Sequence, residues 1–229
     1  MKRSELNGWI DEALAFFDSF HFLVPAWARW SPDQWRKAGG VPDEIRDCQL
    51  GWDITTFGSG DFKKMGLILL TTRNGLLVSA PGKNYPKPYA EKIMMVRDGQ
   101  ITPRHFHMQK QEDIINRGGG KLVIELWPAD PVGKQLLDME FSIPVDAFPR
   151  KLQPGGKVVL SPGESVCLSP CHAHLFYGDG DVMVGEVSRV NDDFTDNCFV
   201  DGMPRFDPIE ENEPARYLLG IDYKPQIKS

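Results

Sequence analysis

Apolar residues recur at helical spacing near the N-terminus of the chain. Six of them fall on one face of a helix: Leu6, Trp9, Ile10, Ala13, Leu14 and Phe17. Ser4 stands just before this stripe, and serine is a residue type that favours the N-cap position. The pattern therefore predicts an amphipathic helix that begins behind a Ser4 cap.

A second helix signal follows at Ser31. Serine at an N-cap and proline at the first helical position, here Pro32, is a combination typical of helix starts. We expect a short helix that runs through Trp35 toward Gly39 and Gly40.

The pattern changes at about Asp47 to short runs rich in β-branched and aromatic residues, separated by glycine, proline and asparagine. Such runs predict many short strands of a barrel or sandwich. No long helical pattern supplies the crossovers that parallel strands need, so we expect antiparallel pairing. The predicted strands cover 65–72, 92–96, 101–107, 121–127, 135–143, 157–160, 165–168, 174–177 and 182–187, and 207–214 is expected to be a surface loop.

Length and composition fit a globular protein. The chain has 229 residues, of which 41% are hydrophobic and 25% charged. This content supports a sizeable core. We expect a single domain over residues 1–229, in which residues 1–46 form a helical N-terminal elaboration.

Charge and targeting signals narrow the function classes. The formal net charge is −6, with no concentrated basic stretch, so nothing indicates nucleic-acid binding. No apolar run approaches the ~20 residues that span a membrane, and residues 1–7 lack the apolar core of a signal peptide. The four cysteines form no C-x-x-C pair. We expect reduced thiols and a cytoplasmic location.

Candidate metal ligands lie between residues 98 and 112. His105 and His107 are two positions apart on a predicted strand, so both side chains point to the same face. Glu112 follows five residues after His107, which leaves room for the chain to turn and return a carboxylate. A mixed nitrogen and oxygen ligand set without thiolates suits one catalytic divalent ion, such as Mn²⁺, Fe²⁺, Co²⁺, Ni²⁺ or Zn²⁺. Coordination positions of that ion are expected to be open to substrate or water.

A second histidine pair, His172 and His174, precedes a turn signal at 178–181. These two side chains also share a face, and either is placed to supply a fourth ligand. Pairs of this form arise by chance, but four of the five histidines in the chain fall into two such pairs.

The first histidine pair resembles the first motif of the cupin family, G-x5-H-x-H-x3-4-E-x6-G. Gly99, His105, His107, Glu112 and Gly119 satisfy every position of it. The resemblance implies a cupin-type antiparallel β-barrel of the jelly-roll kind.

The second cupin motif, G-x5-P-x-G-x2-H-x3-N, is matched less well. Pro170 and a histidine are present, but the spacing is short and His172 stands in place of the glycine. The aromatic residues soon after His174 are similar to those of cupins, which favours His174 as the fourth ligand and leaves His172 as the alternative.

Longer stretches of the chain, 91–107, 112–120 and 184–193, are similar to the bacterial D-lyxose isomerases. This resemblance extends over most of the chain. It implies a manganese-dependent aldose–ketose isomerase that converts D-lyxose to D-xylulose and also acts on D-mannose and D-fructose. It also implies a homodimer.

Such a reaction moves a proton between C1 and C2 and needs an acid–base group. Lys110, between His107 and Glu112, is a candidate that could equally be a surface lysine. Glu186 follows Val184 by two residues on an apolar strand, where burial would raise its pKa toward neutrality. Asp193 and Arg205 are candidates for binding sugar hydroxyls.

Two other function classes stay open at this level. Two histidines with a carboxylate also hold non-haem Fe(II), so a cupin oxygenase is an alternative. A non-catalytic sugar-binding cupin is another.

Overall fold

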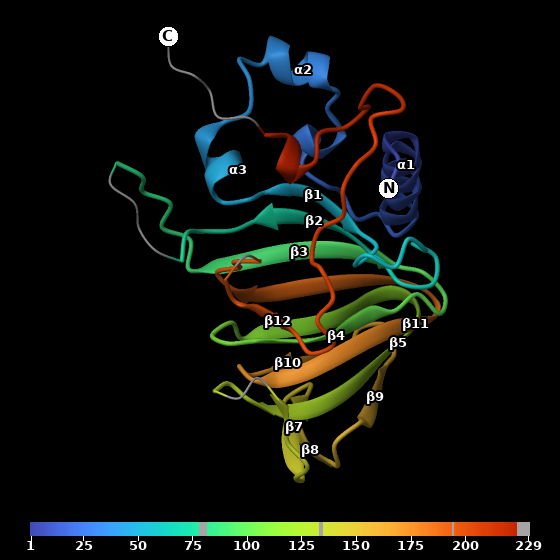
Figure 1. The fold of residues 1–229 in the computed structure, drawn as a ribbon, viewed down its shortest axis with the longest axis vertical. Coiled ribbons are helices and arrows are strands. Elements are labelled where there is room, and N and C mark those ends of the chain that lie inside the picture. The colour runs from blue at the N-terminus through green and yellow to red at the C-terminus, as the bar shows by residue number, and fades with distance from the viewer. Residues whose placement is uncertain (78–81, 133–134, 194, 224–229) are drawn as a thin grey trace.

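The computed structural model describes residues 1–77, 82–132, 135–193 and 195–223 (Figure 1). Its helices are α1 (Arg3–Ser19), the 3-10 helix η1 (Ala26–Arg29), α2 (Pro32–Lys37), α3 (Asp43–Asp47) and the 3-10 helix η2 (Gly220–Asp222). The strands of the described residues are β1 (Gly51–Thr55), β2 (Leu67–Arg73), β3 (Tyr89–Val96), β4 (Thr102–His107), β5 (Glu112–Asp130), β6 (Gln135–Leu136), β7 (Phe141–Val145), β8 (Phe148–Leu152), β9 (Gly156–Leu160), β10 (Ser165–Leu168), β11 (His172–Arg189) and β12 (Asn197–Phe199).

The strands form one antiparallel sheet that runs in the order β1-β2-β3-β11-β5-β10-β7-β8. β4 pairs with β11 on one side and with β12 on the other. Figure 1 shows the helices gathered beside β1 and β2, at the opposite end of the molecule from β7 and β8. The expectation of a mainly β chain with antiparallel pairing and N-terminal helices is confirmed.

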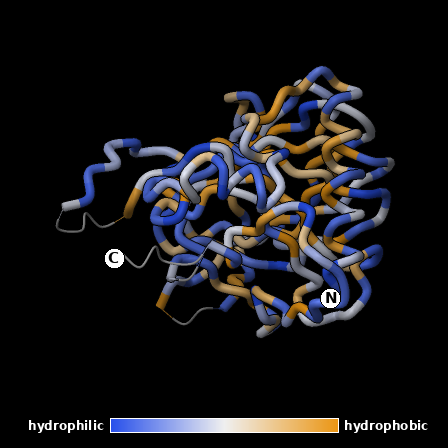
Figure 2. Tube along the Cα trace, turned by 90° about the horizontal axis from the view of Figure 1, so that it is seen from above, coloured by the Kyte–Doolittle hydropathy of each residue, from blue (hydrophilic) through white to orange (hydrophobic). Residues whose placement is uncertain are grey.

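β2 and β3 carry two cores on their two faces. Leu67 and Leu69 point into the interior of the sheet, while Ile68 and Leu70 pack under α1. This alternation follows from the period of two along a strand. Figure 2 shows apolar and polar positions interspersed along the visible trace. Because both cores share the same strands, the helical N-terminus is packed directly onto the sheet.

The two predicted helix starts had different outcomes. α1 begins at Arg3 with Lys2 as its N-cap, so the predicted Ser4 cap is wrong. The carboxylate of Glu5 accepts the Lys2 backbone N–H at 2.8 Å and replaces a serine cap. At α2 the prediction is confirmed, because the Ser31 hydroxyl accepts the Gln34 N–H at 3.3 Å and Pro32 is the first helical residue.

Several predicted strands have different bounds. β5 and β11 are long continuous strands, whereas the sequence predicted 121–127 alone for the first and two separate strands for the second. Their pairing shifts register where glycine-rich segments face each other. A Cβ on Gly119, at φ +92°, would lie 2.2 Å from the Asp181 carbonyl oxygen. The turn predicted at 178–181 is therefore a β-bulge inside a continuous strand.

The predicted strand 135–143 is divided between β6 and β7. α3, β1, β8 and β12 were not predicted. Residues 207–214 lie outside the helices and extended strands, as expected, but two of their acidic side chains are anchored to α1: Arg3 pairs with Glu211 at 2.6 Å, and the Asn7 amide donates to Glu213 at 2.6 Å. No helix of the described residues is long and apolar enough to cross a membrane.

Candidate active site

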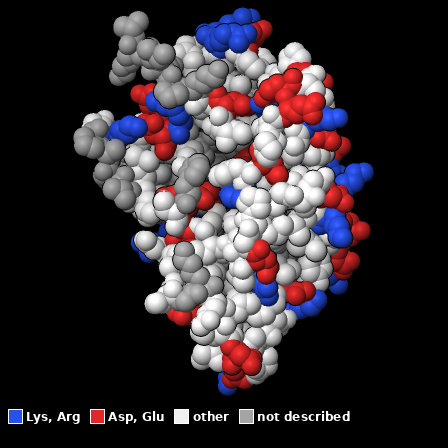
Figure 3. Space-filling view, in the orientation of Figure 1, with Lys and Arg blue, Asp and Glu red and all other residues white. Residues whose placement is uncertain are grey.

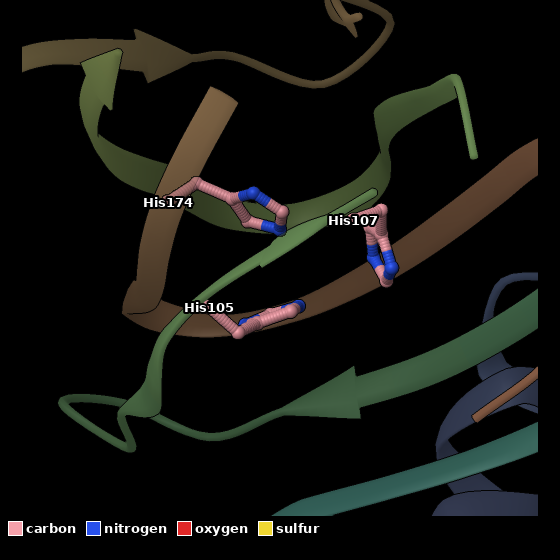
Figure 4. Close-up of side chains that lie close together, drawn as sticks. All are labelled: His105, His107 and His174. Atoms are coloured by element: carbon pink, nitrogen blue, oxygen red, sulfur yellow. The ribbon is translucent and has the colours of Figure 1, made fainter. Parts of the chain in front are cut away.

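Three histidines converge inside the sheet (Figure 4). His105 and His107 lie on β4, and His174 lies on the neighbouring β11, where it pairs directly with His105. One ring nitrogen from each lies within 4.8 Å of the others. His107 and His174 are buried, and His105 is half-buried. The alternation along β4 thus brings the first pair to one point, and strand pairing supplies the third residue.

Two of these imidazoles are oriented by backbone carbonyls. His105 Nδ1 lies 2.9 Å from the Pro103 oxygen, and His174 Nδ1 lies 3.2 Å from the His172 oxygen. A ring that donates from Nδ1 presents an unprotonated Nε2 to a cation. Burial lowers the pKa of both rings below the ordinary value; His174 and His107 add to this at His105, whereas Glu112 partly opposes it at His174. Both are therefore neutral at neutral pH, the form that ligates metals.

Glu112 completes the cluster at the first position of β5. Its two carboxylate oxygens each lie 3.4 Å from a histidine Nε2, one from His107 and one from His174. Oε1 is buried and has no hydrogen-bond partner among the described residues. Burial works to raise the pKa of Glu112, but Lys110 and His107 outweigh it and hold that pKa well below its usual range. An ionised carboxylate with an unpartnered oxygen beside three imidazoles fits a divalent cation.

His172 lies apart from this cluster. Its side chain is partly exposed and its Nδ1 contacts the Ser169 carbonyl oxygen at 3.0 Å. Of the two alternatives for the fourth ligand, the structure places His174 with the other three residues.

Lys110 and Glu186 meet next to the cluster. Lys110 Nζ lies 2.9 Å from a Glu112 oxygen and donates to Glu186 at 2.8 Å. Both side chains are buried, so Lys110 is no surface lysine. The expected rise in the pKa of Glu186 is wrong. Burial does work in that direction, but Lys110 and Lys92 outweigh it and lower the pKa.

Charges of alternating sign continue away from the histidines. Lys92 Nζ lies 3.4 Å from Glu186 and 3.9 Å from Asp193. Arg205 lies 3.5 Å from Asp193 and pairs with Asp53 on β1. Burial opposes ionisation of Asp193, but Lys92 and Arg205 outweigh it and lower its pKa. Each buried charge therefore has a partner of opposite sign, as burial requires.

Histidines, carboxylates and ammonium groups line a common cavity of about 440 Å³, including the part open to solvent. The apolar lining includes Phe57, Leu69, Met94, Phe176 and Phe199. Figure 3 shows acidic and basic residues interspersed over this face of the molecule, with no broad patch of one sign.

The sequence-based prediction missed Lys92. A signal was present, since Lys92, Met94 and Val96 alternate on β3 and the latter two are core residues. A lysine with inward parity on such a strand must be buried and paired. The side-chain oxygen of Asn191 accepts from the ammonium groups of both lysines, Lys92 at 2.7 Å and Lys110 at 3.2 Å.

Comparison with known families supplies the context for this geometry. The family model described as D-lyxose isomerase matches residues 1–223. The chain belongs to the D-lyxose isomerase family. Two members are the D-lyxose/D-mannose isomerases of Escherichia coli O157:H7 and Serratia proteamaculans. The first is 46% identical over 98% of this chain and 99% of its own length, and the second 45% identical over 97% and 98%.

Solved structures agree on the fold of this D-lyxose isomerase family member. The L-ribose isomerase of Cellulomonas parahominis with L-psicose aligns with a TM-score of 0.53 at 17% identity, covering 89% of this chain and 94% of the other. An Acinetobacter sp. DL28 L-ribose isomerase mutant with L-ribose gives 0.54 at 17% identity, covering 89% and 94%. The predicted fold class, a mainly β cupin-type barrel with N-terminal helices, is confirmed, as is the prediction of a sugar isomerase.

Proposed function

We propose that this protein is a metal-dependent aldose–ketose isomerase that interconverts D-lyxose and D-xylulose and also D-mannose and D-fructose. Family membership over the whole described length supports the reaction class. The observation that carries the proposal is the contact of Lys110 with both Glu112 and Glu186 next to three convergent histidines. Metal ligands and a paired acid–base group are thereby brought to one cavity.

We infer that His105, His107, Glu112 and His174 hold one divalent ion per chain, with Mn²⁺ as the proposed metal. Three imidazoles and one carboxylate form a donor set of intermediate softness without thiolates, which suits such an ion. The unpartnered Oε1 of Glu112 supports this set. When bound, the ion supplies Lewis-acid chemistry to oxygens of the reacting carbon atoms.

In this proposal Glu186 moves the proton between C1 and C2 of the sugar. Its carboxylate lines the cavity and is held ionised by Lys110 and Lys92, so it is ready to accept a proton. The Ser188 hydroxyl donates to Glu186 Oε1 at 3.0 Å and fixes its direction. Lys110 carries a proton at Nζ and stabilises negative charge on a substrate oxygen.

Asp193 and Arg205 are proposed to bind sugar hydroxyls at the part of the cavity away from the histidines. Both line it, and Arg205 Nη1 is buried without a hydrogen-bond partner among the described residues. A guanidinium and a carboxylate offer donor and acceptor groups that match vicinal hydroxyls. Phe57, Phe176 and Phe199 line the same cavity and lower its water content, which strengthens such polar contacts.

The test removes bound metal with a chelator, restores single metals, and follows ketose formation from D-lyxose and D-mannose in D₂O. We expect activity with Mn²⁺, under anaerobic conditions as well, and deuterium from solvent in the product. Strict dependence on oxygen would support the oxygenase alternative instead. Sugar binding without deuterium exchange would leave only a binding protein.

His105→Ala tests the metal centre within the same assay. We expect loss of bound Mn²⁺ and of isomerase activity, because one of the convergent imidazoles is gone. His172→Ala is the matched control, since that ring lies outside the cluster, and it should keep both. Full metal content and activity in His105→Ala would contradict the proposal.

Assembly, domain organisation and location stay predictions from the sequence. We propose a homodimer, which light scattering during size-exclusion chromatography would check. A single domain is supported by β2 and β3, which contribute to both cores. We also propose a cytoplasmic location, which cell fractionation would check.

A further inference from the structure

Asp196 is a buried carboxylate that the chemistry above does not use. It lies directly before β12, and the residue is 5% exposed. Its Oδ1 accepts the Gln109 backbone N–H at 2.8 Å, and its Oδ2 accepts the Lys110 backbone N–H at 3.0 Å. The Asp196 carbonyl oxygen also accepts the Met108 N–H at 3.2 Å. One residue thus holds the turn that joins the strand of His107 to that of Glu112.

The same carboxylate faces the one clustered histidine that no backbone carbonyl orients. The Nδ1 atoms of His105 and His174 each contact a carbonyl oxygen. His107 Nδ1 is buried and has no hydrogen-bond partner within the described residues. Asp196 Oδ2 lies 3.7 Å from it, longer than a hydrogen bond but within ion-pair range. An imidazole that binds a cation through Nε2 carries its proton on Nδ1, and that proton needs an acceptor.

We propose that Asp196 is a positioning residue of the metal centre, whose carboxylate fixes the tautomer of His107 and the backbone of the 108–110 turn. This inference rests on the metal centre proposed above. Carboxylates that support metal-bound histidines in this way typically contribute a factor of about 10 to 100 in metal affinity.

The placement of β12 explains how a distant residue reaches this point. β12 pairs with β4 so that Asn197 faces His107 and Phe199 faces His105. Asp196, directly before β12, therefore reaches the 108–110 turn from the strand that pairs with His105 and His107. Its link to the Lys110 backbone also joins the metal side of the cavity to the acid–base side.

The experiment measures Mn²⁺ affinity calorimetrically on chelator-treated full-length protein. Asp196→Asn keeps the size of the side chain but removes its negative charge. We expect Mn²⁺ binding to weaken by about 10- to 100-fold. Asp201→Asn is the matched control, because Asp201 is an exposed partner of Arg104, 2.9 Å away, and it should bind Mn²⁺ like the wild type.

The outcomes separate this inference from the function proposed above. If the wild type binds no Mn²⁺ and none of the other divalent ions tried, the proposed metal centre is wrong, and so is the role inferred for Asp196. If the wild type binds Mn²⁺ and Asp196→Asn binds it equally well, only the inference about Asp196 is wrong. A lower melting temperature of the metal-free variant with unchanged Mn²⁺ affinity would reduce Asp196 to a structural anchor and would likewise overturn it.

A second measurement needs no variant. ¹⁵N–¹H correlation spectra of the wild type loaded with diamagnetic Zn²⁺ report which nitrogen of His107 carries the proton. We expect protonated Nδ1 and unprotonated Nε2. A spectrum with Nδ1 unprotonated would overturn the inference even if Asp196→Asn failed to fold.

Discussion

Both faces of β3 and β11 bury apolar side chains, but only one of them also buries charged groups. Toward α1, Ile93, Met95 and Met183 join an apolar core. Toward the cavity, the same two strands present Lys92 and Glu186. One pair of strands therefore separates a purely apolar core from an interior in which paired charges lie beside further apolar residues such as Met94 and Val184.

The two regions contribute differently to the stability of the fold and to the chemistry. Burial of apolar area stabilises the fold by about 25 cal/mol per Å². Buried charges offset part of their desolvation cost through partners, and well-packed apolar residues would often serve stability as well or better. The charged face is thus retained for chemistry, and the two regions should respond differently to substitution.

The largest expected effect is on catalysis. Glu186→Gln should lower kcat by about 10²- to 10⁴-fold, or about 3 to 5.5 kcal/mol, because a general base is lost while the side-chain size is kept. The far-ultraviolet circular dichroism spectrum should be unchanged. Glu125→Gln is the control on β5, since Glu125 pairs with Lys157 at 2.7 Å near the surface, and kcat should stay within twofold. A kcat within threefold of the wild type in Glu186→Gln would remove that residue from the reaction.

The apolar face should show the reverse behaviour. Phe17 of α1 is fully buried and stacks at 6.4 Å between ring centroids with Trp52. Phe17→Ala should lower the free energy of unfolding by about 3 to 5 kcal/mol through lost burial and a cavity. Denaturant titration measures this, and kcat per folded molecule should be nearly constant. Leu23→Ala, at a residue 83% exposed, should change the free energy by less than about 0.5 kcal/mol.

Sequence patterns correctly predicted the features that depend on local periodicity. The parity of His105 and His107 and the cap at Ser31 are set by residues close in the chain, and the structure reproduces both placements. The continuity of β11 was missed, because residues 178–181 read as a turn. They form a bulge only because β5 brings glycines opposite them, which is a tertiary effect.

The site residues divide in the same way, into those set by nearby sequence and those set by tertiary contacts. Glu112 was predicted from its spacing after His107, whereas the preference for His174 over His172 rested on resemblance, because it depends on the pairing of β11 with β4. The pKa of Glu186 was predicted with the wrong sign, because burial was visible in the pattern while Lys92 and Lys110 as neighbours were not. Long-range charge partners are set by the fold, so periodicity alone does not reveal them.

A smaller effect is expected where the two regions meet at the end of β1. Asp207 accepts hydrogen bonds from the Thr56 and Gly58 backbone N–H groups and from the Thr55 and Thr56 hydroxyls. Asp207→Ala leaves these donors without their acceptor and should lower the free energy of unfolding by about 1 to 3 kcal/mol in denaturant titration. Asp61→Ala, at an exposed turn, is the comparison. Equal losses in both variants would contradict a special role for Asp207.

The smallest effect tests how the charged face sets the protonation of Glu186. Burial works to raise its pKa, and Lys110 and Lys92 outweigh it, so the net shift is downward. A base must be deprotonated, so kcat/KM falls as the pH falls through its pKa. Lys92→Met removes one of the two cations and raises that pKa. The acidic limb of the profile should therefore move to higher pH.

Lys92→Arg keeps the positive charge and should leave the acidic limb of the pH profile of kcat/KM near its wild-type position.

The Met variant separates two explanations for the buried lysine. If Lys92 only fills space, methionine, which is apolar and of similar length, would preserve both the profile and the stability. If its charge holds Glu186 ionised, the acidic limb of the profile moves. The melting temperature of the protein should stay the same, because the apolar core under α1 packs against the other face of β3. A shift to lower pH would contradict the alternating charges as the cause of the lowered pKa.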